Sequence, residues 1–134
     1  MSDVAPLALV TGGLHRIGAA MAIRLADAGY ALALHSRSGG QPDAELAEAL
    51  RKNGTEWTEC SADLSQSGAA MALFDAVVAR FGRAPTLLIN NASMFGAGSI
   101  AQADEENLQD HLTTNLIAPT LLAKATAMAA KAAS

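Results

Sequence analysis

Short apolar runs and helical segments alternate along the chain, and this alternation constrains the fold more than any other feature of the sequence. The apolar runs cover residues 7–10, 31–34 and 86–89, and a more polar strand-like segment covers residues 55–60. Short runs of this kind are typical of strands, and a continuous apolar run is typical of a strand buried on both faces of a parallel sheet. The sequence therefore predicts four strands in one parallel sheet.

Each of the four predicted strands is followed by a segment with helical spacing. The predicted helices cover residues 16–28, 42–52, 66–81 and 105–131. A parallel strand pair needs a right-handed crossover, and repeated crossovers place helices on both faces of the sheet. The sequence therefore predicts a doubly wound α/β fold. Residues 1–134 contain no linker or low-complexity tract, so we expect a single domain.

The spacing of apolar residues also predicts which helical faces are buried. On the first helix the expected buried stripe consists of Ile17, Met21, Leu25 and Ala28. On the third helix it consists of Ala70, Phe74, Val77 and Phe81. We expect the last helix to bend or break near Pro119, because proline removes an internal hydrogen bond.

The first strand leads into a glycine-rich turn, Thr11-Gly12-Gly13-Leu14-His15-Arg16-Ile17-Gly18. Glycines let the backbone approach a pyrophosphate closely, and the following helix N-terminus offers free N–H groups and a positive dipole end. The turn follows the first strand and opens the first helix, which is the context that phosphate binding requires. We predict a nucleotide site here, with a plain tight turn as the alternative.

The residues after the second strand predict which dinucleotide binds. An Asp or Glu at this position binds the ribose 2′-hydroxyl of NAD, whereas an arginine binds the 2′-phosphate of NADP. The sequence here is His35-Ser36-Arg37-Ser38, and the next acidic residue is Asp43. Arginine can hold a phosphate through two parallel bonds. We therefore predict NADPH, held in a small cationic pocket of His15, Arg16 and Arg37; a charged surface loop is the alternative.

The glycine-rich turn resembles the Thr-Gly-x-x-x-Gly-x-Gly motif of the short-chain dehydrogenase/reductase family. Arg16 replaces the middle glycine, as in its pteridine reductase branch. Asn90-Asn91-Ala92-Ser93 resembles the family's Asn-Asn-Ala-Gly, and Ser93 followed by Met94-Phe95 again resembles pteridine reductases. The resemblance implies a Rossmann-type sheet with strand order 3-2-1-4 and hydride transfer from NADPH to a pterin or carbonyl substrate.

The resemblance also assigns residues to roles. It implies that Asp63 and Leu64 bind the adenine, that Asn90 and Ala92 line the adenosine ribose, and that Ser93 approaches cofactor and substrate. Phe95 would stack on a pterin ring, and Asn115 would be the catalytic asparagine that holds a water. With the residues of the two preceding motifs, the expected cofactor-binding set is Gly12, His15, Arg16, Ile17, Arg37, Ser38, Asp63, Leu64, Asn90, Ala92 and Ser93.

Two of these residues, Asp63 and Asn115, have simpler interpretations. Asp63 follows a strand and could cap a helix, a position for which Ser65 competes. Asn115 could join two helices by a hydrogen bond, although asparagine is a poor helix former. Phe95 lies in a glycine-rich loop without periodic apolar partners, so packing gives no reason for it. The residues alone leave these alternatives open.

Charge and composition exclude several classes of protein. Nine Lys and Arg against thirteen Asp and Glu give a net charge of −4, which disfavours binding to nucleic acid or anionic membranes. We expect no membrane span, and the histidine spacing predicts no metal site. Cys60 is the only cysteine, so no internal disulfide forms and a reducing cytoplasm is expected.

The resemblance extends over the first half of the family's domain. Family members continue with a catalytic serine and a Tyr-x-x-x-Lys helix, but here the only tyrosine is Tyr30, and position 34 is leucine. We therefore expect a truncated chain that binds cofactor without turning over a small-molecule substrate. The family also implies a homo-oligomer. The alternative is a non-catalytic dinucleotide-binding or dimerising module.

Overall fold

The four predicted strands form one parallel sheet in the order β3-β2-β1-β4. The computed structural model describes residues 4–96 and 98–134. The strands are β1 (Leu7–Val10), β2 (Ala31–Ser36), β3 (Trp57–Ser61) and β4 (Leu87–Ile89). β1 pairs with β2 from Leu7 and Ala31 onward, and β4 lies on its other side. The predicted parallel sheet and strand order are confirmed.

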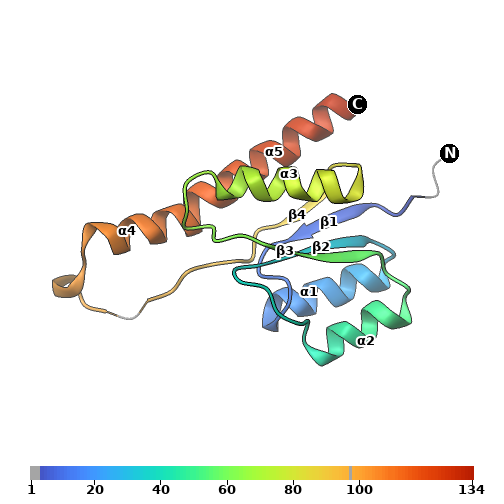
Figure 1. Ribbon diagram of the computed structural model, residues 1–134, viewed down its shortest axis with the longest axis horizontal. Coiled ribbons are helices and arrows are strands. Elements are labelled where there is room, and N and C mark those ends of the chain that lie inside the picture. The colour runs from blue at the N-terminus through green and yellow to red at the C-terminus, as the bar shows by residue number, and fades with distance from the viewer. Residues whose placement is uncertain (1–3, 97) are drawn as a thin grey trace.

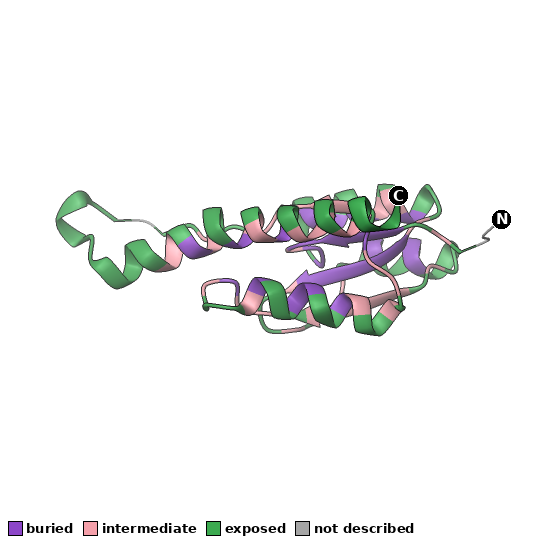
Figure 2. Cartoon of the chain, turned by 90° about the horizontal axis from the view of Figure 1, so that it is seen from above, coloured by how far each residue is buried: buried purple, intermediate pink, exposed green. Residues whose placement is uncertain are grey.

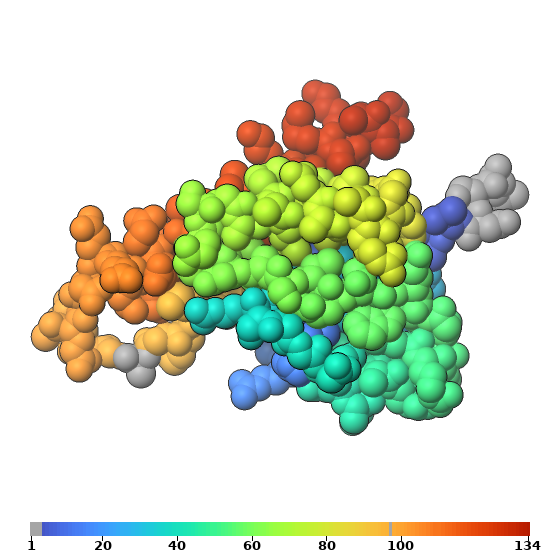
Figure 3. Space-filling model, in the orientation of Figure 1, coloured from blue at the N-terminus to red at the C-terminus, as the bar shows by residue number. Residues whose placement is uncertain are grey.

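Helices cover both faces of this sheet (Figure 1). α1 (Arg16–Asp27) and α2 (Ala44–Lys52) lie on one face, whereas α3 (Ala69–Phe81) and α5 (Ala118–Ala133) lie on the other. α4 (Glu105–Leu112) projects beyond the end of the sheet, as Figure 3 also shows in its orange atoms. The arrangement is the doubly wound, Rossmann-type fold that the sequence predicts.

Alternate strand residues fill the two halves of the core. Leu7 and Leu9 pack with the helical residues Phe74 and Leu122 on the α3–α5 face. Their neighbours Ala8 and Val10 pack on the α1–α2 face. All residues of β1 are buried, as expected for a central strand covered by helices on both sides (Figure 2).

The predicted buried stripe of α1 is wrong. Ile17 and Met21 are 65% and 38% exposed. The buried residues of this helix are instead all small: Gly18, Ala19, Ala22 and Ala26. α1 approaches the glycine-rich turn so closely that a Cβ atom on Gly18 would lie 2.0 Å from the Gly12 carbonyl oxygen. Small residues therefore make the closest contact with the sheet, Ile17 and Met21 face outward, and Ile23 and Leu25 pack against the edge of the core. On α3, by contrast, Ala70, Phe74 and Val77 are buried as predicted.

α3 begins three residues later than the predicted segment 66–81. Gly68 precedes it with φ of +82°, a left-handed conformation that no right-handed helix includes. β2 is longer than predicted, because His35 and Ser36 pair with Cys60 and Ser61 of β3. The polar residues after the second apolar run therefore begin inside the strand.

The last helix is interrupted, as predicted, but just before Pro119. Residues Thr113–Ile117 form a π-helical turn between α4 and α5, labelled η2, and a 3₁₀ turn, η1 (Ile100–Gln102), precedes α4. Pro119 lies in the first turn of α5, where it has no N–H to donate to the carbonyl four residues earlier. The wider turn places the Ala118 N–H on the Thr113 carbonyl instead.

Gly18→Ala tests the close approach of α1 to the turn. The added methyl would meet the Gly12 backbone, which cannot move away without shifting the turn, so we expect the free energy of unfolding to fall by about 3 kcal/mol. Gly96→Ala is the control, since its Cβ would meet only the His111 side chain at 3.4 Å. Urea titration measures both variants. If Gly18→Ala and Gly96→Ala lower the free energy of unfolding by the same small amount, α1 does not approach the turn this closely.

Candidate functional site

The carboxyl ends of the strands open into a pocket formed by two adjoining hollows, here called the strand-end pocket. The turn-side hollow, of about 680 Å³, is lined by Gly12, His15, Arg16, Ile17 and Asn91 among others. The loop-side hollow, of about 360 Å³, is lined by Asp63, Leu64, Ser65 and Phe95 among others. The two hollows share four residues, His35, Arg37, Ala92 and Ser93.

This pocket brings together most of the predicted site residues. They come from the turn after β1, the loop after β2, the loop after β3 and the loop after β4. In open parallel sheets, ligands bind outside the carboxyl ends of the strands, at the point where the strand order reverses. Ser38, Asn90 and Asn115 do not line either hollow.

Thr11 and Asn91 join the glycine-rich turn to the end of β4. The buried Thr11 hydroxyl accepts the backbone N–H groups of Asn91 and Ala92, both at 2.9 Å. The Asn91 side-chain amide donates to the carbonyls of Thr11 and Gly12, both at 3.1 Å. Gly12 itself has φ of +60°. We did not predict Asn91 as a site residue, although its place in the Asn-Asn pair after β4 was a usable signal.

His35 supports the same turn from β2. The Gly12 N–H donates to His35 Nδ1 at 3.0 Å, so His35 carries its proton on Nε2 and donates it to the Ala62 carbonyl at 2.8 Å. This neutral ring is buried, and burial lowers the pKa of His35 below its ordinary value of 6.5. The uncharged His35 ring therefore connects the turn to the loop after β3 through one hydrogen bond to each.

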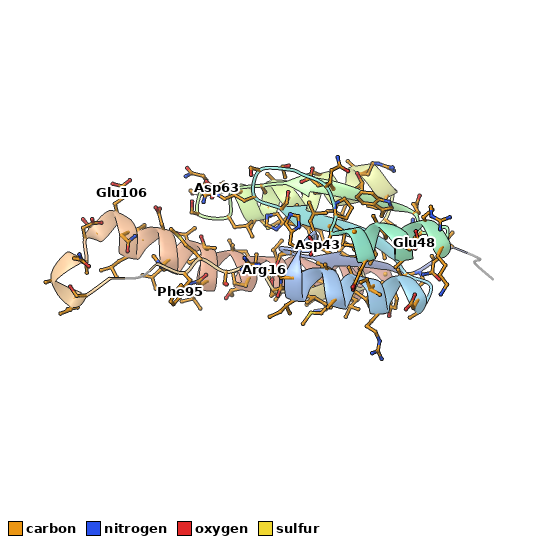
Figure 4. All side chains as sticks on the ribbon, turned by 90° about the horizontal axis from the view of Figure 1, so that it is seen from below. Arg16, Asp43, Glu48, Asp63, Phe95 and Glu106 are labelled. Carbon is orange, nitrogen blue, oxygen red and sulfur yellow. The ribbon has the colours of Figure 1, made fainter. Side chains whose placement is uncertain are left out.

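The turn side of the pocket is not purely cationic, contrary to our expectation. Asp43, at the start of α2, accepts the His15 Nδ1–H at 2.7 Å and the Arg16 backbone N–H at 2.9 Å. Both partners lower the pKa of Asp43, with the His15 hydrogen bond the larger cause. Arg16 has φ of +52°, the left-handed conformation that glycine adopts most easily. Figure 4 labels Arg16 and Asp43 close to one another.

Arg37 also has an acidic neighbour. Its guanidinium lies 3.6 Å from an oxygen of Asp63, and the Arg37 side chain is 75% exposed. Asp63 accepts both the N–H and the hydroxyl of Ser65, which lower its pKa. Because α3 begins only at Ala69, Asp63 caps a local turn rather than that helix. Ser65 binds Oδ1 of Asp63, and Arg37 lies beside its other oxygen, Oδ2.

Hydrogen bonds to β3 stabilise the loop that carries Arg37. The Glu59 carboxylate accepts the hydroxyls of Ser36 and Ser61, at 2.6 and 2.7 Å. The Ser36 oxygen in turn accepts the N–H of Gly39 at 2.9 Å. These hydrogen bonds hold the backbone on either side of Arg37, whose side chain extends into solvent beside Asp63.

The segment after β4 is held by the last helices. Both groups of the Asn115 side-chain amide bind the Met94 backbone, at 2.7 Å to its N–H and 2.9 Å to its carbonyl. Asn90 donates to the Pro119 carbonyl at 3.1 Å, so it faces α5 rather than the pocket. Phe95, next to Met94, is 92% exposed at the pocket edge.

Residues 4–96 and 98–134 contain no cluster of three or more His, Cys, Asp or Glu side chains able to hold a metal ion. In the same residues no helix has the length and apolar character needed to cross a membrane.

His35→Asn tests whether the neutral His35 ring makes the stability of the fold depend on pH. A folded-state pKa below 6.5 means that the unfolded chain binds the proton more readily, so the stability due to neutral His35 is present above pH 6.5 and lost as the pH falls below it. Asparagine retains an acceptor near the Nδ1 position but does not titrate. We expect the melting temperature of the native chain to fall more steeply between pH 7 and pH 5 than that of the variant. If the melting temperatures of the two proteins fall equally with pH, His35 is not the group whose protonation destabilises the fold.

Comparisons with known proteins place this chain in a family. The short chain dehydrogenase family profile matches residues 6–134. A putative ketoacyl reductase of the granaticin polyketide synthase of Streptomyces violaceoruber is 34% identical over 119 residues, which are 89% of this chain and 43% of that protein.

Solved structures give the same result. A metagenomic short-chain oxidoreductase in complex with NADP has 33% identity and a TM-score of 0.78, covering 98% of this chain and 60% of that one. L-sorbose reductase from Gluconobacter frateurii, complexed with NADPH and L-sorbose, has 25% identity and a TM-score of 0.74, covering 90% and 46%. The chain spans about half the length of such relatives, and it belongs to the short-chain dehydrogenase family.

Proposed function

We propose that the chain binds NADPH in the strand-end pocket and forms the cofactor-binding part of a reductase. The observation that carries this proposal is the meeting of the glycine-rich turn with Arg37 at the reversal point of the sheet. The family's solved relatives include proteins in complex with NADP and with NADPH. No acidic residue lies within residues 35–38, where an NAD-specific site would have one.

The residues present fit such a cofactor. At Gly18 a Cβ atom would meet the Gly12 carbonyl, so this glycine lets the N-terminus of α1 pack directly against the turn. A phosphate bound at the turn would then face the first N–H groups of that helix. Arg37, with His15 and Arg16, would hold the 2′-phosphate, and Ser38 would assist from the same loop. Asp63 and Leu64 would contact the adenine, while Ala92 and Ser93 would line the ribose. When bound, NADPH supplies the hydride for reduction of a C=N or C=O bond.

We further propose a pterin or a carbonyl compound as substrate. Phe95 supports the pterin, because it is an aromatic ring exposed at the mouth of the pocket with no packing role. Asn115 holds the backbone just before Phe95 through two hydrogen bonds, and this position fits a residue that orders the reaction site. Asn90 supports α5 in this proposal rather than the ribose.

Residues 1–134 bind the cofactor without completing the reaction in this proposal. Reduction by hydride needs a proton donor at the other atom of the double bond. The only tyrosine, Tyr30, precedes β2, whereas the pocket lies beyond the other end of that strand, about 20 Å away along six residues. A tyrosine at that distance cannot donate a proton in the pocket.

We also propose that the chain self-associates through its last helices. Leu108, Leu112 and Leu116 follow one another at intervals of four residues, and each is more than half exposed. Exposed apolar side chains in a row are typical of contacts between protein chains. α4, which carries the first two, projects from the body of the molecule (Figure 1).

Arg37→Ala tests the cofactor assignment. Hydrogen bonds to charged groups contribute about 1.5–3 kcal/mol, so loss of the guanidinium should weaken NADPH binding by about tenfold or more. NADH, which has no 2′-phosphate, should change by less than about twofold. Titration calorimetry on the 134-residue chain measures both. Arg51→Ala is the control, because Arg51 is exposed and pairs with Glu48 away from the pocket. Equal weakening of NADPH and NADH would contradict the assignment.

Phe95→Ala tests the pterin assignment. In a protein that joins this chain to a Tyr-x-x-x-Lys segment, the variant should raise the KM for a pterin about tenfold, since aromatic stacking contributes about 1–3 kcal/mol. The KM for NADPH should stay unchanged. Phe95→Tyr keeps the ring and should behave like the native protein. Steady-state kinetics with a dihydropterin measures the three proteins, and an unchanged pterin KM in the alanine variant would remove the pterin from the proposal.

A further inference from the structure

The Asp43 carboxylate lies inside the region that the proposed function assigns to a phosphate. Its two oxygens bind two different groups of the turn, Oδ1 the His15 imidazole at 2.7 Å and Oδ2 the Arg16 backbone N–H at 2.9 Å. Asp43 also lines the turn-side hollow together with Arg37. An anion supplied by the protein itself therefore already uses two of the groups that would receive the anion of the cofactor.

The backbone of Asp43 explains how its side chain reaches the turn. Asp43 N–H donates to the Leu14 carbonyl at 2.9 Å, which ties the start of α2 to the turn after β1. Asp43 occupies the N-cap position of α2, yet its side chain makes no capping hydrogen bond to that helix. Aspartate is among the best N-cap residues, so this side chain has forgone a favourable local interaction in order to bind the turn.

The groups that Asp43 binds are those that suit a phosphate. The first N–H groups of a helix have no acceptor within the helix, and they attract anions together with the positive dipole end. Arg16 is the first residue of α1, and Asp43 satisfies its N–H. Asp43 also holds the His15 ring at Nδ1, beside that N–H. A phosphate and a carboxylate cannot both occupy this position, because two anions in contact repel one another.

We propose that Asp43 is an internal competitor of the cofactor's 2′-phosphate. In the free chain its carboxylate occupies the anion position at His15 and Arg16, and NADPH displaces it. The displaced side chain then turns to the free N–H groups of its own helix, where it caps α2. Asp43 thus lowers the affinity of the chain for NADPH, which carries the 2′-phosphate, and reduces its preference for NADPH over NADH. This inference rests on the proposed NADPH binding.

The test compares Asp43→Asn with Glu48→Gln in the full 134-residue chain. Both substitutions remove one negative charge from α2, but Glu48 pairs with Arg51 and lies further along the helix, as Figure 4 shows. The probes are adenosine 2′,5′-bisphosphate, which carries the 2′-phosphate, and 5′-AMP, which does not. Titration calorimetry measures the dissociation constants. Asp43→Ser, also a good N-cap residue without charge, repeats the test should the asparagine retain the contact.

We expect Asp43→Asn and Asp43→Ser to bind the bisphosphate at least about fivefold more tightly than the native chain, with 5′-AMP changed by less than about twofold. Glu48→Gln should match the native chain for both probes. Weaker bisphosphate binding by the Asp43 variants would overturn the proposal, because Asp43 would then position His15 for the phosphate. Equal tightening in all three variants would also overturn it, because the effect would then come from overall charge.

A second measurement separates this inference from the cofactor assignment. Inorganic phosphate is titrated into ¹⁵N-labelled chain while the amide resonance of Arg16 is followed by NMR. The resonance should shift at lower phosphate concentration in Asp43→Asn than in the native chain. If it does so while neither nucleotide binds, Asp43 competes with phosphate at the turn, but the NADPH assignment fails and with it the competition with the cofactor. If phosphate shifts it equally in both chains, Asp43 does not compete for this position.

Discussion

The pocket depends on the hydrogen bonds between Thr11 and Asn91, which connect two strand ends that are eighty residues apart in the sequence. The Thr11 hydroxyl binds two successive N–H groups after β4, and the Asn91 amide returns to two carbonyls of the turn. A buried polar group that loses its partner costs free energy, so these groups keep the two strand ends together. With β4 fixed beside β1, the Gly12 carbonyl faces α1, and only glycine fits at position 18.

This buried network contrasts with the exposed ion pairs on the pocket surface. Thr11 and His35 are buried, and all of their hydrogen bonds lie between neighbouring elements. The carboxylates of Asp43 and Asp63, by contrast, are accessible to solvent and bind His15 and Arg37 at the surface. Exposed ion pairs contribute little to stability because water and salt screen them. The backbone of the pocket is therefore rigid, while its charged side chains can exchange partners.

Much of the fold follows from local patterns in the sequence. The strands were predictable because apolar runs such as Leu7–Val10 are buried on both faces, and their alternation with helices predicted that they run parallel. The strand order was expected from the family resemblance. The buried face of α1 was not predictable from periodicity, because Gly18 draws the helix against the turn and reverses which side small residues occupy. The π-helical turn before Pro119 was predictable only as a break, since spacing does not define which carbonyl the next N–H reaches.

The candidate site was less predictable than the fold, and the reason is that sequence motifs name residues but not their partners. His15, Arg16 and Arg37 were expected to form a cationic pocket, with no acidic residue after the second strand before Asp43. In space, Asp43 reaches back over the turn from the start of α2 and binds the first two. A net charge of −4 makes such neighbours common, so a local site for an anion has to form against the acidic residues of its own chain. Selectivity for a phosphate then depends on the difference between two anions competing for the same donors, rather than on the number of basic residues.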